Sequence, residues 1–179
     1  DYRRDGLLAR GQPVSVPPDF RTLTYNKSLE CVAAPQQGPL AGELIAVSEH
    51  SLDAAGNLRS FVLGTNHVTR FSVKRTDEFD VSDCTILPPD DLLLLERRFS
   101  FVRGIAIRIR RVPLSSLMEG AVVDGRTVIE ADLAFEIDNM EGISIHRTTG
   151  GETIITIVSD DNFSVLQRNL LLQFAIVGG

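Results

Sequence analysis

The sequence predicts an all-β protein that forms part of a β-propeller. The main observation is a pattern that occurs three times in the 179 residues: an acid, a short apolar run, a turn, a second apolar run and another acid. The leading acids are 53 (83 − 30) and 58 (141 − 83) residues apart. A period of about 40–50 residues with four strands per unit is the signature of a propeller blade. We therefore expect blades over residues 20–76, 77–133 and 134–179.

Each copy is expected to begin with an antiparallel hairpin, over residues 29–49, 80–97 and 140–161. The two ends of a hairpin meet on the side away from its turn, and blades of one ring share an orientation. The acids at the hairpin ends should therefore gather around one rim: Glu30 and Glu49, Asp83 and Glu96, and Glu141 and Asp160.

Two outer strands are expected to follow each of the first two hairpins, at 58–63 and 68–73 and at 105–110 and 127–130. Residues 105–110 alternate between apolar and polar side chains, which is the period of a half-buried strand. Only residues 170–176 follow the third hairpin, and residues 1–16 could supply an outer strand of an earlier blade. The sequence thus predicts about three blades of a roughly six-bladed ring. The missing N-terminal half of that ring would be a partner.

Composition agrees with one β-rich domain or part of one. Hydrophobic residues make up 43% of the chain, which is ample for a core. The net charge of −6 argues against general binding to nucleic acids or anionic membranes. No apolar run approaches the length of a transmembrane helix.

The two cysteines, Cys31 and Cys84, each follow the leading acid of a copy. If they occupy equivalent positions in neighbouring blades, their Cα atoms should lie beyond the roughly 7 Å limit for a disulfide. We therefore expect two small buried thiols.

Carboxylates and amides on one rim suit a hard cation such as Ca²⁺, which takes six to eight oxygen ligands. In the third copy, Asp138 and Asn139 precede the hairpin and three polar residues follow it. The alternative is that these residues stabilise turns through bonds to their own backbone. The candidate metal ligands are Glu30, Glu49, Asp83, Glu96, Glu141, Asp160, Asp161 and Asn162.

Arg97 and Arg98 follow a rim acid directly and are candidates to bind an anionic substrate. Arg108 and Arg110 are expected to face solvent or acids on the next strand. His50 follows Glu49 and could bind substrate or transfer protons, or be a plain surface histidine. No Gly-x-Ser-x-Gly, Gly-x-Gly-x-x-Gly or P-loop pattern occurs.

Six short segments together form a recognisable pattern: Asn26 to Glu30, Phe79 to Asp83, Leu93 to Ser100, Asp138 to Gly142, Ser159 to Ser164 and Gln167 to Phe174. They resemble the bacterial "esterase-like activity of phytase" family, from about residue 20 to the end. Two departures are Ser28 and Cys31, where the family pattern often has Gly and Ala.

The resemblance implies an exported protein, periplasmic or secreted, with a phytase-like propeller. It further implies calcium-dependent hydrolysis of phosphate esters or related esters. In that scheme Arg97 and Arg98 hold the phosphate oxygens, and Glu141 or Asp160 orients the attacking water. Two alternatives stay open. One is a non-catalytic, calcium-stabilised propeller that acts as a binding module, and the other is a metal-dependent propeller lactonase or esterase.

Overall fold

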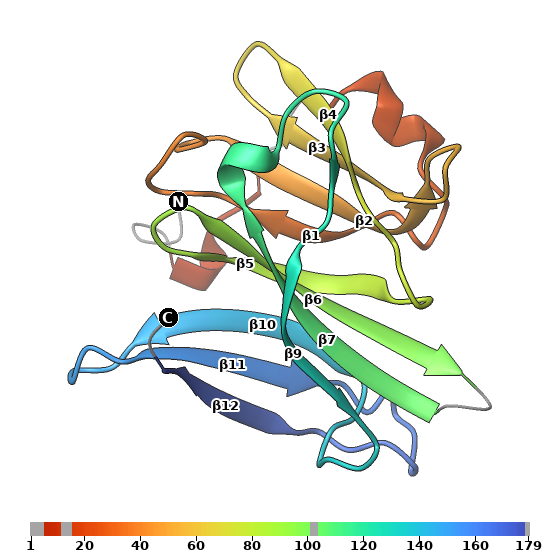
Figure 1. The fold of residues 1–179 in the computed structure, drawn as a ribbon, viewed down its shortest axis with the longest axis vertical. Coiled ribbons are helices and arrows are strands. Elements are labelled where there is room, and N and C mark those ends of the chain that lie inside the picture. The colour runs from red at the N-terminus through yellow and green to blue at the C-terminus, as the bar shows by residue number, and fades with distance from the viewer. Residues whose placement is uncertain (1–5, 12–15, 101–103, 178–179) are drawn as a thin grey trace.

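The computed structural model describes residues 6–11, 16–100 and 104–177. In these ranges the protein is all-β, with twelve strands, three short 3-10 helices and no α-helix. Figure 1 shows three sheets following one another along the long axis, coloured orange to yellow, green and blue in chain order. None of the helices in the described ranges is long and apolar enough to cross a membrane.

The first sheet is an antiparallel meander of four strands with a fifth short strand at its edge. The fifth strand, β8, comes from the second predicted repeat and runs parallel to β4. The members of this sheet are β1 (Leu29–Ala33), β2 (Leu44–Leu52), β3 (Leu58–Leu63), β4 (Val68–Val73) and β8 (Val122–Val123).

The second sheet has four antiparallel strands and the third has three. The second contains β5 (Asp80–Leu87), β6 (Asp91–Ser100), β7 (Gly104–Pro113) and β9 (Arg126–Asp132). The third contains β10 (Met140–Arg147), β11 (Thr153–Ser159) and β12 (Leu171–Ile176). The three expected hairpins are therefore present and antiparallel, and so are the expected outer strands. Closure into a ring and the number of blades remain predictions.

The three 3-10 helices lie outside the sheets: η1 (Gly6–Leu8), η2 (Pro18–Thr22) and η3 (Leu114–Ser116). The strand expected within residues 1–16 is not found at 6–8, which form η1, whereas residues 1–5 and 12–15 lie outside the described part of the chain.

The middle sheet is buried on both faces, which explains the uninterrupted leucine run of β6. Leu92 and Leu94 belong to the apolar core shared with the first sheet. Leu93 and Leu95 belong to the core shared with the third sheet. Because successive side chains of a strand point to opposite faces, one apolar run joins two cores.

A β-bulge occurs at the same place in each inner hairpin. The pairs Leu29↔Ser48, Val81↔Glu96 and Met140↔Ser159 each precede the irregularity. The bulged residues, on the first strand of each hairpin, are therefore Glu30, Ser82 and Glu141. On the second strand, the residues directly after the last pair are Glu49, Arg97 and Asp160. In the second hairpin, Ser82 and Arg97 thus hold the positions that acids hold in the other two hairpins. The predicted pair, Asp83 and Glu96, is displaced by one residue on each strand.

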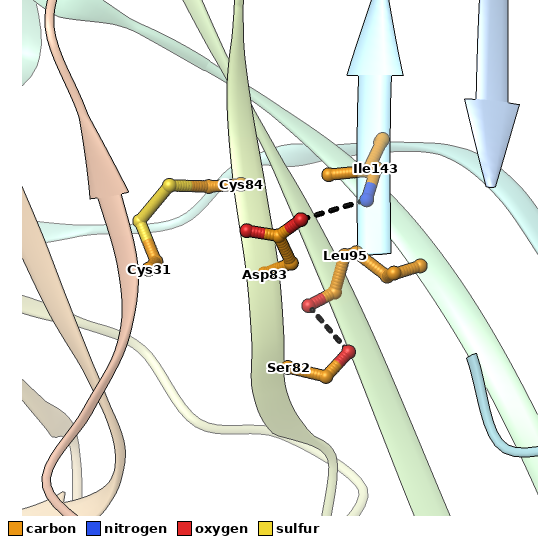
Figure 2. The surroundings of a disulfide bond; sticks show 6 residues. All are labelled: Cys31, Ser82, Asp83, Cys84, Leu95 and Ile143. Atoms are coloured by element: carbon orange, nitrogen blue, oxygen red, sulfur yellow. Dashed lines mark hydrogen bonds between the residues drawn. A yellow bond between two sulfur atoms is a disulfide. The ribbon is translucent and has the colours of Figure 1, made fainter. Parts of the chain in front are cut away.

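The expectation of two free thiols is wrong, because Cys31 and Cys84 form a disulfide with a Cα–Cα distance of 5.1 Å. By register Cys31 corresponds to Asp83, not to Cys84, so the two cysteines do not occupy equivalent positions. The inner strands β1 and β5 also pack against each other, which brings this offset pair within bonding distance. Figure 2 shows the bond joining the first and second sheets.

Candidate functional site

Arg97 lies where the three sheets meet. It extends from β6, and its Nη1 donates a hydrogen bond of 2.8 Å to Oδ1 of Asn139, the residue before β10. Its Nη2 lies 3.6 Å from a carboxylate oxygen of Glu49 on β2 and 3.4 Å from one of Glu141 on β10. One guanidinium therefore contacts side chains from the first and third sheets.

Two further acids complete what we call the carboxylate cluster: Glu30, Glu49, Asp83 and Glu141. Part of the Glu30 side chain reaches solvent, yet burial of its carboxylate raises its pKa. The negative charges of Glu49 and Glu141 raise that pKa further, and Arg97 opposes them. The cluster is therefore incompletely neutralised by its single arginine.

Asp83 is half-buried beside the disulfide and connects the second sheet to the third. Its Oδ2 accepts a hydrogen bond of 2.7 Å from the backbone N–H of Ile143 (Figure 2). Burial raises the pKa of Asp83, and hydrogen bonds from the backbone N–H groups of Ile143 and Cys84 partly offset that rise. The neighbouring Ser82 hydroxyl donates to the carbonyl of Met140 at 2.9 Å, a second link between these sheets.

The raised pKa of Glu30 predicts how its replacement depends on pH. The folded state binds the Glu30 proton more tightly than the unfolded state, so this group's contribution to stability is lost as pH rises from about 4.5 through its raised pKa. Glu30→Gln should therefore raise the melting temperature at pH 7, by on the order of 1 °C, and give no gain near pH 4. Thermal melts at both values, with the exposed Glu152→Gln as control, would measure this. An equal shift at both pH values would contradict it.

Glu96 does not join the carboxylate cluster. Its side chain is fully buried and is bound by Arg108 Nε at 2.8 Å and by Nε of Arg110 at 2.8 Å. The cause is the displaced register of the second hairpin. Arg97, not Glu96, holds the position equivalent to Glu49 and Asp160. Glu96 is therefore held as the centre of a buried ion triad. Arg108 and Arg110 therefore contact an acid on a neighbouring strand, but that strand is β6, which precedes theirs in the sequence.

The Asp160 to Asn162 segment serves a turn. Oδ1 of Asp160 accepts the N–H of Asn162 at 3.0 Å, and Oδ1 of Asp161 accepts the N–H of Phe163 at 2.9 Å. Asp161 Oδ2 also accepts a bond from the Asn169 side chain at 2.8 Å. Asp160 stays close to the third sheet's rim end, since its N–H donates to the carbonyl of Asn139. Its carboxylate, however, is not among the charges that act on Glu30.

An open pocket of about 620 Å³ lies beside Arg97. Four of its lining side chains are basic and three are acidic. We call it the Arg97 pocket, and it is lined by Lys27, Glu49, Arg75, Glu78, Asp80, Arg97, Arg98, Phe99 and Ser100. Lys27, Arg75 and Asp80 were not predicted. Lys27 and Asp80 lie only three residues before the leading acids Glu30 and Asp83, but none of the three belongs to the repeated pattern of acids.

His50 has an acidic partner that the sequence did not reveal. Its Nδ1 lies 2.8 Å from Oδ1 of Asp80, and Arg75 Nε donates to the same oxygen at 2.7 Å. Arg98 is positioned by packing, with its guanidinium 4.8 Å from the centre of the Phe79 ring. The pocket wall is thus held by pairs from the first two sheets.

No group of three or more His, Cys, Asp or Glu side chains in the described ranges is gathered closely enough to hold a metal ion. The chemistry of the carboxylate cluster nonetheless fits a hard cation, which prefers oxygen ligands. Glu49 and Glu141 share a single guanidinium, and the pKa of Glu30 is raised first by burial and then by the negative charge of the neighbouring acids.

Sheets of five, four and three strands that contribute charged residues to one common end are consistent with a propeller-like fold. A family model described as "Phytase-like: Esterase-like activity of phytase" matches residues 1–163, and the chain belongs to this family. The match starts before residue 20 and stops short of the resembling segment at 167–174. Neither a curated protein nor a solved structure matches the chain.

Proposed function

We propose that the chain carries the active site of a cation-dependent hydrolase that cleaves phosphate esters or related esters. The observation that supports this most is the contact of Arg97 with carboxylates from two other sheets at the edge of an open pocket. Carboxylates can accept protons and bind cations, and arginines bind anionic groups. Membership of a family described by esterase-like activity agrees with this reaction type.

The anionic group of the substrate would bind to Arg97, Arg98 and Lys27. All three line the same pocket. The ion pairs of Arg97 are long, at 3.4 and 3.6 Å, so the guanidinium can contact a substrate oxygen without losing a short carboxylate bond. Arg98 keeps its orientation through Phe79 and through a bond from Nη1 to the carbonyl of Asp77 at 3.3 Å.

An anionic substrate would be repelled by the carboxylate cluster unless a cation offsets its charge. Calcium would be held by Glu30, Glu49 and Glu141. When bound, it would neutralise these acids and polarise the phosphoryl oxygen.

Glu141 is the carboxylate best placed to accept a proton from the attacking water. Its side chain is about one-third exposed, at 31%, so water can reach it. Its Oε1 accepts a bond of 2.8 Å from the Asn139 amide, and the same Asn139 binds Arg97 through its oxygen. Asn139 therefore positions the proton acceptor and an anion-binding group together. Asp160 has no role in the proposed reaction, because its carboxylate accepts a hydrogen bond within a turn.

Glu141→Gln should reduce kcat by about 100-fold or more, the usual contribution of a positioned general base. The measurement is hydrolysis of p-nitrophenyl phosphate and p-nitrophenyl acetate by the full protein, with calcium and with a chelator. Arg97→Lys should mainly raise KM, because lysine cannot grip an anion with two parallel bonds.

Asp160→Asn and the exposed Glu152→Gln are the matched controls and should leave kcat within about twofold. Calcium should also raise the melting temperature of the wild type, and Glu141→Gln should remove most of that rise. Full activity of Glu141→Gln would overturn the assignment. If a chelator left the activity unchanged and calcium did not change the melting temperature, the proposed dependence on a cation would be wrong.

We also propose a periplasmic or secreted location and a partner that covers the third sheet. The Cys31–Cys84 disulfide supports the location, because disulfides persist in oxidising compartments. The loop after β11 supports the partner, since the side chains of Phe163 and Val165 are fully exposed. The expected partner is the other half of the propeller.

A further inference from the structure

The inner strand of the second sheet, β5, lies between the inner strands of the other two sheets and packs against both β1 and β10. Glu30 and Glu141 stand at the bulges of β1 and β10, and Ser82 stands at the corresponding bulge of β5. The middle strand therefore has a hydroxyl group where its two neighbours have carboxylates.

Two hydrogen bonds hold the backbone on either side of Glu141 to β5. The Ser82 hydroxyl donates to the carbonyl of Met140 at 2.9 Å. The N–H of Ile143 donates to Oδ2 of Asp83 at 2.7 Å. Met140 precedes Glu141 directly and Ile143 follows it by two residues. The backbone that carries the proposed proton acceptor is therefore fixed to β5 at two points.

The disulfide has the same relation to Glu30. Cys31 follows Glu30 directly, and its bond to Cys84 ties that part of β1 to β5. Figure 2 shows the disulfide on one side of β5 and the Asp83 carboxylate on the side of Ile143, as expected for neighbouring residues of a strand. Two adjacent residues of β5 are thus joined to the two strands that carry Glu30 and Glu141.

The Asp83 carboxylate serves this contact between strands. It accepts two backbone N–H groups, one of them from β10. Burial is the main cause of the raised pKa of Glu30, and among the neighbouring acids Glu49 and Glu141 raise it more than Asp83 does. Asp83 therefore acts less on Glu30 than the two acids that we assign to calcium beside it.

We propose that Ser82, Asp83 and the disulfide are positioning groups for the cation site, and that β5 supplies this site with no ligand. Together they set the separation between Glu30 and Glu141, which belong to different sheets and which a bound calcium ion would have to bridge. The inference rests on the proposed function of the carboxylate cluster. Groups that orient metal ligands typically change metal affinity by about 10- to 100-fold when they are removed.

Calcium affinity of the full chain, measured by isothermal titration calorimetry below the melting transition of every variant, tests the proposal. Asp83→Ala should weaken calcium binding by about tenfold or more, because the Ile143 N–H loses its acceptor. Asp83→Asn keeps an oxygen acceptor at that place and should stay within about threefold of the wild type. Cys31→Ala/Cys84→Ala removes no oxygen ligand, yet it should also weaken binding by about tenfold.

A control variant separates positioning from general loss of stability. Leu92→Ala opens a cavity in the core at the turn end of the second hairpin, away from the cluster, and should keep the affinity of the wild type. Hydrolysis of p-nitrophenyl phosphate is the second readout. Asp83→Ala should lower kcat more than it raises KM, because the displaced group is the proton acceptor Glu141.

An equal loss of affinity in Asp83→Asn and Asp83→Ala would make Asp83 a ligand and overturn the inference. Wild-type affinity in Asp83→Ala or in the double cysteine variant would overturn it too, and so would a matching loss in Leu92→Ala. These three results leave the proposed function in place. A wild type that neither binds calcium nor hydrolyses an ester would instead overturn the proposed function, and this inference with it.

Discussion

Replacing both cysteines by alanine should lower the melting temperature by about 8–16 °C. The disulfide joins residues 53 apart in sequence. Closing a loop of that length removes unfolded-state entropy worth about 4 kcal/mol, and in a domain of this size each kcal/mol shifts the melting temperature by roughly 2–4 °C. The measurement is thermal and urea unfolding of wild type and of Cys31→Ala/Cys84→Ala, each with and without a dithiol reductant.

The reductant should destabilise the wild type once unfolding exposes the bond, and should not affect the double variant. Both cysteines are buried, so each alanine also leaves a small volume unfilled, which adds to the loss. A double variant that melts with the wild type would mean that the apolar core shared by the first two sheets holds them together without the covalent link.

Glu96→Gln should cost about 3–5 kcal/mol, the usual penalty for breaking a buried ion group by removing one charge. The carboxylate is fully buried, as are nearly all of the Arg108 and Arg110 side chains. Both guanidiniums would lose their buried counter-charge and keep only the exposed acids Asp77 and Asp124. Chemical unfolding at pH 7 measures the loss. Asp19→Asn, which breaks the exposed pair with Arg70 at 2.9 Å, is the matched comparison and should cost less than about 1 kcal/mol.

A third variant separates charge from packing. Replacing Glu96 by Leu and both arginines by Met should recover most of the lost stability, because apolar groups of similar size remove the desolvation cost of all three charges. Glu96→Gln should also leave any calcium-dependent rise in melting temperature unchanged, in contrast to Glu141→Gln. If Glu96→Gln lost the calcium-dependent rise in melting temperature, Glu96 would be a cation ligand after all.

The strands could be predicted from the sequence because each apolar run packs on a face of a sheet. The alternation in 105–110 and the leucine run of β6 both follow from that burial. The one-residue offset of the second hairpin could not be predicted, since a β-bulge inserts a residue without changing the apolar pattern. Asp83 and Glu96 offered a plausible alignment of acids, whereas the structure aligns Ser82 and Arg97 with the acids of the other hairpins.

The same offset explains the other differences. Glu96 turns inward to Arg108 and Arg110 because it takes the place of the buried Ser48 in the first hairpin. The partnership of His50 with Asp80 depends on contact between two sheets, and no pattern within either strand indicates it. Asp160 and its neighbours stabilise a turn, as Asp and Asn often do by accepting bonds from nearby backbone N–H groups.

The first two sheets are fastened at both ends, by the disulfide on the inner strands and by β8 on the outer edge of β4. The third sheet is joined to them by an apolar core and a few polar bonds, such as that between Asp83 and the Ile143 N–H. Because neither the disulfide nor β8 joins the third sheet to the other two, we expect it to be the smaller foldon, which opens before the doubly fastened one. Glu141 lies on the smaller foldon and Glu30 on the larger, so local opening would dismantle the carboxylate cluster long before the protein unfolds.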